Sequence, residues 1–86
     1  MKVKLHKKFT KQFSKLNKKE KLKCKGRLNL FLDDPFNKLL KNHALQGKYK
    51  GLRSINMGGD LRAIYEMINS GTAFFVDLDT HSNLYS

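Results

Sequence analysis

The segment LRAIYEMINSGTAFFVDL, residues 61–78, decides the fold of this chain. Apolar and polar side chains alternate through residues 61–68, which is the period of a β-strand with two different faces. Residues 69–71, Asn-Ser-Gly, are typical of a turn. Residues 72–78 are apolar enough for a strand that is central or covered on both faces. The segment therefore predicts two antiparallel strands joined by a short turn.

Two more strands are predicted outside this segment. Residues 51–57 alternate in the same way, and Gly58-Gly59 after them is a two-residue hairpin signal. Residues 1–6 also alternate, and so short a strand must pair within the sheet to bury its apolar side chains. The remaining segments are predicted as a loop over residues 36–49, with a short helical turn near residues 37–41, and a tail over residues 79–86.

Two helices are predicted between the first strand and the others. Residues 7–16 carry apolar side chains at helical spacing, with lysines on the other face. The second helix begins at Asn17, which with Glu20 resembles a capping box, and runs to about Leu32, before Asp33-Asp34-Pro35. The order β-α-α-β-β-β predicts an α+β fold in which both helices pack on one face of an antiparallel sheet, in a single domain over residues 1–86.

The chain is strongly basic, with 18 Lys and Arg against 7 acidic residues and a formal net charge of +11. Residues 1–25 hold eleven lysines and one acid, Glu20. Such a charge indicates a polyanionic partner: nucleic acid, an anionic membrane surface or an acidic protein. The lone cysteine, Cys24, cannot form an internal disulfide, and no apolar run approaches the length of a membrane span. We therefore expect a cytoplasmic protein, with Cys24 as a small apolar helix residue more readily than a reactive thiol.

Metal and phosphate-loop motifs are absent from the sequence, as is a serine nucleophile elbow. The absence of these motifs leaves enzymatic reactions that need only acids, bases and cations. RNA cleavage is such a reaction because RNA carries its own 2′-hydroxyl nucleophile. His43, His81, Asp60, Arg53 and Arg62 supply each residue type that this reaction needs. Composition alone does not establish the reaction, because each of the five could equally be a solvated surface group or part of a turn.

Three motifs together resemble a known family. They are NHALQGKYKGLR over residues 42–53, GDLRAIY over residues 59–65 and THSNLY over residues 80–85. Their order and spacing are similar to those of the RelE/ParE superfamily of bacterial toxins, and most of all to its YafQ-type branch. The resemblance is detailed from about residue 43 to residue 85.

The resemblance implies the toxin of a type II toxin–antitoxin pair, an endoribonuclease (mRNA interferase) that cuts messenger RNA in the ribosomal A site without a metal or other cofactor. It implies His43, Asp60 and His81 as catalytic residues, with no assignment of base and acid between the two histidines. It also implies a cognate antitoxin, expected to be acidic, and contacts of the lysine-rich helices with ribosomal RNA. The phosphate- and RNA-binding residues are expected to be Arg53, Arg62, Asn56, Lys48, Lys50 and Tyr85.

Two positions depart from the YafQ-type pattern. Asn56 stands where such toxins can carry a further active-site histidine, and Leu61 stands where they can carry an aromatic residue. Asn56 cannot exchange protons near neutral pH, although it can orient RNA by hydrogen bonds. Two alternatives stay open: a non-nuclease toxin of the ParE kind that targets DNA gyrase, and a basic RNA-binding domain without activity.

Overall fold

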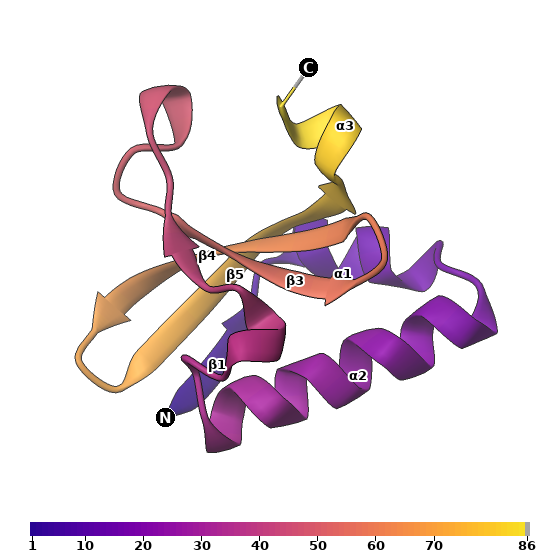
Figure 1. Cartoon of the computed structure of the whole chain (residues 1–86), viewed down its shortest axis with the longest axis horizontal. Helices are drawn as coiled ribbons and strands as arrows, with labels where there is room; N and C mark the ends of the chain where they lie inside the picture. The colour runs from indigo at the N-terminus through magenta and orange to yellow at the C-terminus, as the bar shows by residue number, and fades with distance from the viewer. Residues whose placement is uncertain (86) are drawn as a thin grey trace.

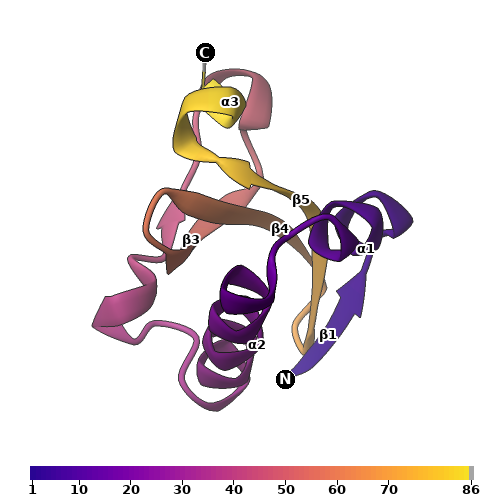
Figure 2. The same ribbon diagram turned by 90° about the vertical axis from the view of Figure 1, so that its right-hand side faces the viewer.

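A five-stranded sheet forms the centre of the computed structural model, which describes residues 1–85 (Figure 1). The strand order is β1-β5-β4-β3-β2. Helices α1 and α2 lie on one side of the sheet, and the η2 loop and the short helix α3 rise from the other side (Figure 2). The elements are β1 (Lys2–Leu5), α1 (Lys7–Ser14), α2 (Lys18–Asp33), η1 (Lys38–Leu40), β2 (His43–Ala44), η2 (Gly47–Tyr49), β3 (Arg53–Gly58), β4 (Leu61–Asn69), β5 (Thr72–Thr80) and α3 (His81–Tyr85).

The helix boundaries follow local chemistry that the sequence already indicates. Asn17 accepts the Glu20 N–H at 2.8 Å and Glu20 accepts the Asn17 N–H at 3.1 Å, so the predicted capping box is confirmed. Helix α2 ends at Asp33, just before Asp34-Pro35, because the residue before a proline avoids the helical region. The predicted helical turn in the following loop is η1.

The main core lies between the two helices and the sheet. Phe31 of α2 packs edge-on against Tyr65 of β4 and Phe75 of β5, with ring centroids 5.0 and 5.3 Å apart. Phe9 of α1 packs against the same Phe75 at 5.7 Å. One aromatic side chain on β5 therefore joins both helices to the sheet, and aromatic pairs of this geometry add to the free energy gained by burial. The α+β class and the packing of both helices on one face are confirmed.

Cys24 belongs to this core and is fully buried. Burial, with a smaller contribution from the charge of Glu20, raises the pKa of the Cys24 thiol from 9.0 to about 11. A thiol with a raised pKa holds less of the reactive thiolate. The structure therefore supports the interpretation of Cys24 as an apolar core residue.

Several details of the prediction were wrong. Strand β1 pairs in parallel with β5, so the sheet is mixed rather than antiparallel throughout. Strand β5 continues through Thr80, and α3 occupies most of the predicted tail. The hairpin turn falls at Gly59-Asp60 because the register shifts between Asn56 and Gly58 and places Gly58 opposite Leu61 in the ladder.

The short strand β2 was not predicted at all. Among residues 1–85, no helix is both long and apolar enough to cross a membrane.

Candidate functional site

A second, smaller core covers the side of the sheet that faces away from α1 and α2. Buried Leu45, Ile64 and Leu84 form it, with Tyr49 and Leu52 packed against them. Because Leu45 lies before η2 and Leu84 lies in α3, this core holds the η2 loop and the C-terminal helix over the same face of β4 (Figure 1). We call this face of the sheet, between η2 and α3, the open face.

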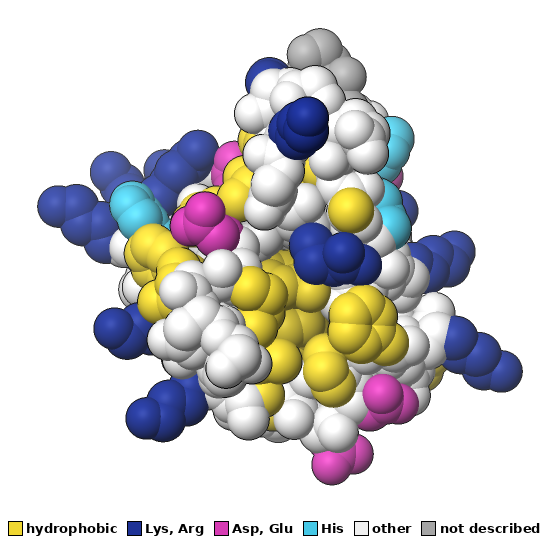
Figure 3. Space-filling model, turned by 90° about the vertical axis from the view of Figure 1, so that its left-hand side faces the viewer, with side chains coloured by type: hydrophobic (Ala, Val, Ile, Leu, Met, Phe, Trp, Pro, Cys, Tyr) yellow, Lys and Arg dark blue, Asp and Glu magenta, His cyan; other side chains and the backbone are white. Residues whose placement is uncertain are grey.

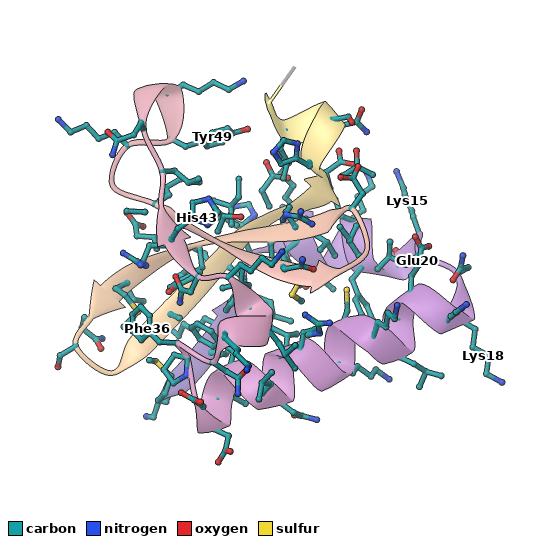
Figure 4. The ribbon with its side chains drawn as sticks, viewed as in Figure 1. Lys15, Lys18, Glu20, Phe36, His43 and Tyr49 are labelled. Atoms are coloured by element: carbon teal, nitrogen blue, oxygen red, sulfur yellow. The ribbon has the colours of Figure 1, made fainter. Side chains whose placement is uncertain are left out.

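His43 lies on the open face. It pairs with Ser54 across β2 and β3, and Ser54 pairs with Ile64 of the second core across β3 and β4. Directly paired residues of antiparallel strands project to the same side. Figure 4 labels the His43 side chain on β2. The side chain is exposed, and its Nδ1 lies 2.8 Å from the carbonyl oxygen of Lys41.

That contact determines the tautomer of His43. A carbonyl oxygen only accepts hydrogen bonds, so Nδ1 must carry the proton. In the neutral ring Nε2 then bears the lone pair, which is the state that a general base requires. Lys41 has a left-handed backbone, with φ at 47°, which is uncommon for a residue other than glycine.

A row of polar residues crosses the open face beside His43. Asn56 of β3 pairs with Arg62 of β4, and Arg62 pairs with Asp79 of β5, so the three side chains share one side of the sheet. Arg62 Nη1 donates to the carbonyl oxygens of Gly59 at 2.9 Å and Leu61 at 3.0 Å. These bonds hold the guanidinium group at the end of the β3–β4 hairpin.

The side chain of Asn56 stabilises the β3–β4 hairpin. Its Oδ1 accepts the N–H of Gly58 at 2.7 Å, at the point where the register of the hairpin shifts. The side chain therefore satisfies a backbone donor that the bulge takes out of the ladder. A hydrogen-bonding residue rather than a proton-exchanging one occupies this position.

His81 and Asp60 meet through the backbone. The N–H of His81 donates to the carbonyl oxygen of Asp60 at 2.8 Å, and both side chains are exposed. Asp60 also borders a hollow of about 210 Å³ between the hairpin turn and α2, which Lys19, Glu20 and Lys23 line from the helix. The structure therefore brings His81 and Asp60 to the same corner of the sheet, where Arg62 is also anchored.

Arg53 does not join this group. It pairs with Tyr65, whose ring belongs to the main core, so its side chain lies on the helix side of the sheet. Its Nε donates to Asn42 Oδ1 at 2.8 Å, and its guanidinium lies 5.4 Å from the centre of the Phe36 ring. The placement argues against the expected phosphate contact and indicates that Arg53 stabilises the segment before β2.

Lys48 and Lys50 lie at η2 and are exposed, beside the open face. Lys48 Nζ lies 5.2 Å from the centre of the Tyr49 ring, and Tyr49 points from η2 toward α3 (Figure 4). The side chain of Tyr85, expected to contact RNA, falls outside the part of the chain whose side chains the structure describes.

Two residues of the open face were missed by sequence reasoning. Asp79 was placed in a tail, but it lies on β5, and its Oδ1 accepts the Thr80 N–H at 2.8 Å and Asn83 Nδ2 at 3.0 Å. Ser54 is fully buried, and its hydroxyl has no hydrogen-bond partner within residues 1–85. The alternation of Asp77, Leu78 and Asp79 could have led to the prediction of a longer strand. No signal in the sequence indicates that Ser54 is buried without a hydrogen-bond partner.

Comparison with known proteins identifies the family. A sequence model described as "Bacterial toxin of type II toxin-antitoxin system, YafQ" matches residues 1–86. The chain belongs to the YafQ toxin family. The resemblance seen in the sequence motifs is thereby confirmed, and this YafQ-family chain is a toxin of the type II toxin–antitoxin class. Among curated protein sequences, none matches the chain.

Solved structures share the fold of this YafQ-family toxin. YafQ from E. coli strain BL21(DE3) superimposes with a TM-score of 0.79 at 24% identity, covering 98% of this chain and 97% of that one. The E. coli DinJ–YafQ toxin–antitoxin complex gives 0.76 at 24% identity over 98% and 96%. The YoeB/ParE toxin from Agrobacterium tumefaciens gives 0.77 at 19% identity over 94% and 99%.

Proposed function

We propose that this YafQ-family toxin is a ribosome-dependent endoribonuclease that cleaves messenger RNA without a metal ion. The observation that carries the proposal is the contact of His43 Nδ1 with the Lys41 carbonyl oxygen, because it leaves Nε2 free to accept a proton on the open face. Arg62 on that face and the exposed Lys48 and Lys50 beside it would attract the RNA backbone.

In this mechanism His43 Nε2 removes the proton of a ribose 2′-hydroxyl. The 2′-oxygen attacks the adjacent phosphorus, and the bond from phosphorus to the 5′-oxygen of the next nucleotide breaks. His81 donates a proton to that leaving oxygen, so the products are a 2′,3′-cyclic phosphate and a free 5′-hydroxyl. Asp60, at the same corner, orients His81 or assists the proton transfer.

Arg62 would stabilise the charge that develops on the phosphoryl oxygens. Its guanidinium group is held in place by two backbone carbonyls, so little reorganisation is needed when the phosphate arrives. Lys48 and Lys50 would contact neighbouring phosphates, and Tyr85 would stack on a base. Asn56 would act indirectly, by holding the hairpin that carries Arg62.

Two partners follow from the proposal. The lysine-rich helices α1 and α2 would bind ribosomal RNA, with an affinity that falls steeply as salt rises. An acidic antitoxin would restrain the toxin. The YafQ of E. coli was solved in complex with DinJ, described as a toxin–antitoxin complex. The net charge of +11 on this chain favours an antitoxin that is acidic.

Translation in vitro with a defined message tests the function. Wild-type toxin is expected to cut the message only when ribosomes are translating it, and the 5′ fragment should end in a cyclic phosphate. His81→Ala is expected to cut at least about 10²-fold more slowly, the usual contribution of one acid–base group. His6→Asn is the matched control, because His6 caps α1 with a side-chain acceptor that asparagine can replace.

Two results would contradict the proposal. One is His81→Ala cutting as fast as the wild type. The other is a message that stays intact with wild-type toxin while DNA damage appears, which would point to gyrase as the target.

A further inference from the structure

A hollow lies between the turn of the β3–β4 hairpin and the start of α2. It has a volume of about 210 Å³, and charged side chains from both elements border it, namely Lys19, Glu20 and Lys23 of α2 and Asp60 of the turn. The carbonyl oxygen of Asp60 accepts the N–H of His81, so the hollow adjoins the corner of the sheet where these two residues meet. Sites for drug-sized ligands measure about 300–1,000 Å³, so this smaller hollow suits a single small ring system.

The wall of the hollow on the hairpin side is apolar. Met57 and Leu61 line it, and both belong to the main core. Between them, Gly58 has a φ of 110°, and a Cβ atom at this position would lie 2.7 Å from Cδ of Lys23. The absence of a side chain therefore lets the stem of Lys23 lie against the hairpin backbone. Leu61 stands where YafQ-type toxins can carry an aromatic residue, and a larger ring here would take up part of the hollow.

The charged groups around the hollow are two ammonium groups and two carboxylates. Within residues 1–85 the structure has one ion pair, between Lys8 and Asp77, so the four groups do not pair with one another. Glu20 lies on the side of α2 that faces the hairpin (Figure 4). Its Oε1 accepts the N–H of Asn17 at 3.1 Å, which leaves Oε2 for a ligand. The carboxylates would repel a phosphate and the lysines would repel a metal cation, so the set favours a neutral group with both hydrogen-bond donors and acceptors.

A nucleobase has the properties that this hollow requires. Unpaired RNA bases present a flat ring face and an edge of hydrogen-bonding groups, and proteins contact both. Guanine O6 and N7 accept hydrogen bonds from lysine. Guanine N1–H and N2–H₂ are adjacent donors, and among the four RNA bases guanine alone offers a carboxylate two adjacent donor atoms on its pairing edge. Lysines and a carboxylate around one apolar hollow therefore favour guanine.

We propose that this hollow binds an unpaired guanine of the messenger RNA. The ring lies against the apolar wall, Lys19 and Lys23 donate to O6 and N7, and Glu20 accepts from N1–H and N2–H₂. The inference rests on the proposed function for RNA as the substrate, and it adds a base preference at one fixed distance from the cleaved bond. Because the hollow adjoins Asp60 and His81, a guanine held there would fix the register of the message relative to the reacting groups.

Hydrophobic side chains also gather on another face of the molecule, with Lys and Arg around them (Figure 3). Phe36, one of the exposed apolar residues at 67% exposure, has the Arg53 guanidinium 5.4 Å from the centre of its ring. Neither residue borders the hollow between α2 and the hairpin. A nucleotide that stacked on Phe36 would therefore affect this ring and leave the signals of Gly58 unchanged.

Nuclear magnetic resonance on the full-length, ¹⁵N-labelled toxin tests the site without the ribosome. Titration with GMP, IMP, AMP, CMP and UMP compares five bases on the same ribose phosphate, and the amide signals of Gly58 and Gly59 report on the hollow. The Kd for GMP is expected to be at least about 5-fold lower than for the others. IMP lacks the N2 amino group, and the other three lack the adjacent pair of donors.

Two variants separate the carboxylate from the space of the hollow. Glu20→Gln keeps an acceptor for the N–H of Asn17, so it should fold like the wild type but bind GMP no better than IMP. Leu61→Phe fills part of the hollow and should lose the preference for GMP. Glu66→Gln is the matched control, because Glu66 is exposed on β4 and does not border the hollow, and it should bind all five nucleotides like the wild type.

A translated message with randomised nucleotides around its cleavage region identifies the source of the base. Sequencing of the fragments made by the wild type is expected to show guanine enriched at one fixed position relative to the cut. Glu20→Gln should lose this enrichment, and Glu66→Gln should keep it.

Other outcomes overturn the inference. Equal shifts from all five nucleotides would assign the hollow to phosphate alone, and shifts of the Phe36 ring without shifts of Gly58 would place the base on the other face. GMP binding without enriched guanine in the message would remove the message as the source, and weaker ribosome binding by Glu20→Gln would then assign the base to ribosomal RNA. By contrast, a wild-type toxin that binds GMP in the hollow but cuts no message would contradict the proposed function and leave the guanine site in place.

Discussion

The backbone N–H of His81 donates a 2.8 Å hydrogen bond to the carbonyl oxygen of Asp60. This bond ties the first residue of α3 to the turn between β3 and β4. Thr80, just before His81, pairs with Leu61 just after Asp60, so the strand ladder and this bond act together. The position of His81 is therefore determined by the hairpin that also anchors Arg62.

The carboxylate of Asp60 can be separated from this structural bond. Asp60→Asn keeps the backbone carbonyl that accepts from His81, and its side chain is exposed, so the melting temperature should stay close to that of the wild type. If the carboxylate orients His81 or moves a proton, message cleavage should fall by about 10²-fold. Single-turnover cleavage on translating ribosomes measures this, and an unchanged rate would remove Asp60 from the catalytic group.

The roles of the two histidines predict different pH profiles. With one base and one acid, the cleavage rate of the wild type should rise and then fall as pH increases. His43→Ala should lose the rising limb, because the base must be deprotonated, and His81→Ala should lose the falling limb, because the acid must be protonated. Residual rates measured across pH 5–9 check this, and loss of the same limb in both variants would contradict the assignment.

The two arginines give a matched pair. Arg62→Gln should slow cleavage by about 10²-fold or more, because it removes a fixed cation from the open face. Arg53→Gln should leave the rate within about 3-fold of the wild type but cost about 1–2 kcal/mol of unfolding free energy, since it breaks the bond to Asn42 and the stacking on Phe36. Urea unfolding and cleavage assays of both proteins separate these effects, and the reverse pattern would restore Arg53 to the site.

The alternation of side chains along β3 and β4 already separates these two arginines in the sequence. Arg53, Ile55 and Met57 share a face in an alternating strand, and the last two are core residues. Asn56 projects to the other face of the strand, and it pairs with Arg62. Residue chemistry and the family resemblance assigned both arginines to phosphate, whereas strand alternation places them on opposite sides of the sheet.

Other features could not be predicted from local pattern. The parallel pairing of β1 with β5 joins residues about seventy positions apart, and no local residue signals it. The shift at Gly58 moves the hairpin turn by one residue, and it depends on a side-chain bond from Asn56 that composition does not reveal. The capping box at Asn17 was predictable because both of its partners lie within one turn.

Cys24 should be unreactive in the folded toxin. Its pKa of about 11, against an ordinary 9.0, means about 100-fold less thiolate at pH 8. Burial hinders access further. Labelling by a thiol-specific disulfide reagent should therefore be slow in buffer and fast in urea. Rapid labelling of the native protein, with an unchanged melting temperature, would show that the thiol is accessible.

Ser54 carries the one fully buried side-chain oxygen or nitrogen within residues 1–85 that lacks a hydrogen-bond partner. Its residue is completely buried between His43 and Ile64 in the strand ladder. A buried hydroxyl without a partner costs free energy, so Ser54→Ala should match the wild type or exceed it by up to about 1 kcal/mol in unfolding free energy. Thr72→Ala is the control, since Thr72 of β5 is the other buried serine or threonine among residues 1–85, and it keeps 7% of its surface exposed. If Ser54→Ala instead loses more than about 1 kcal/mol, the hydroxyl must have a partner in solution, such as a bound water beneath His43.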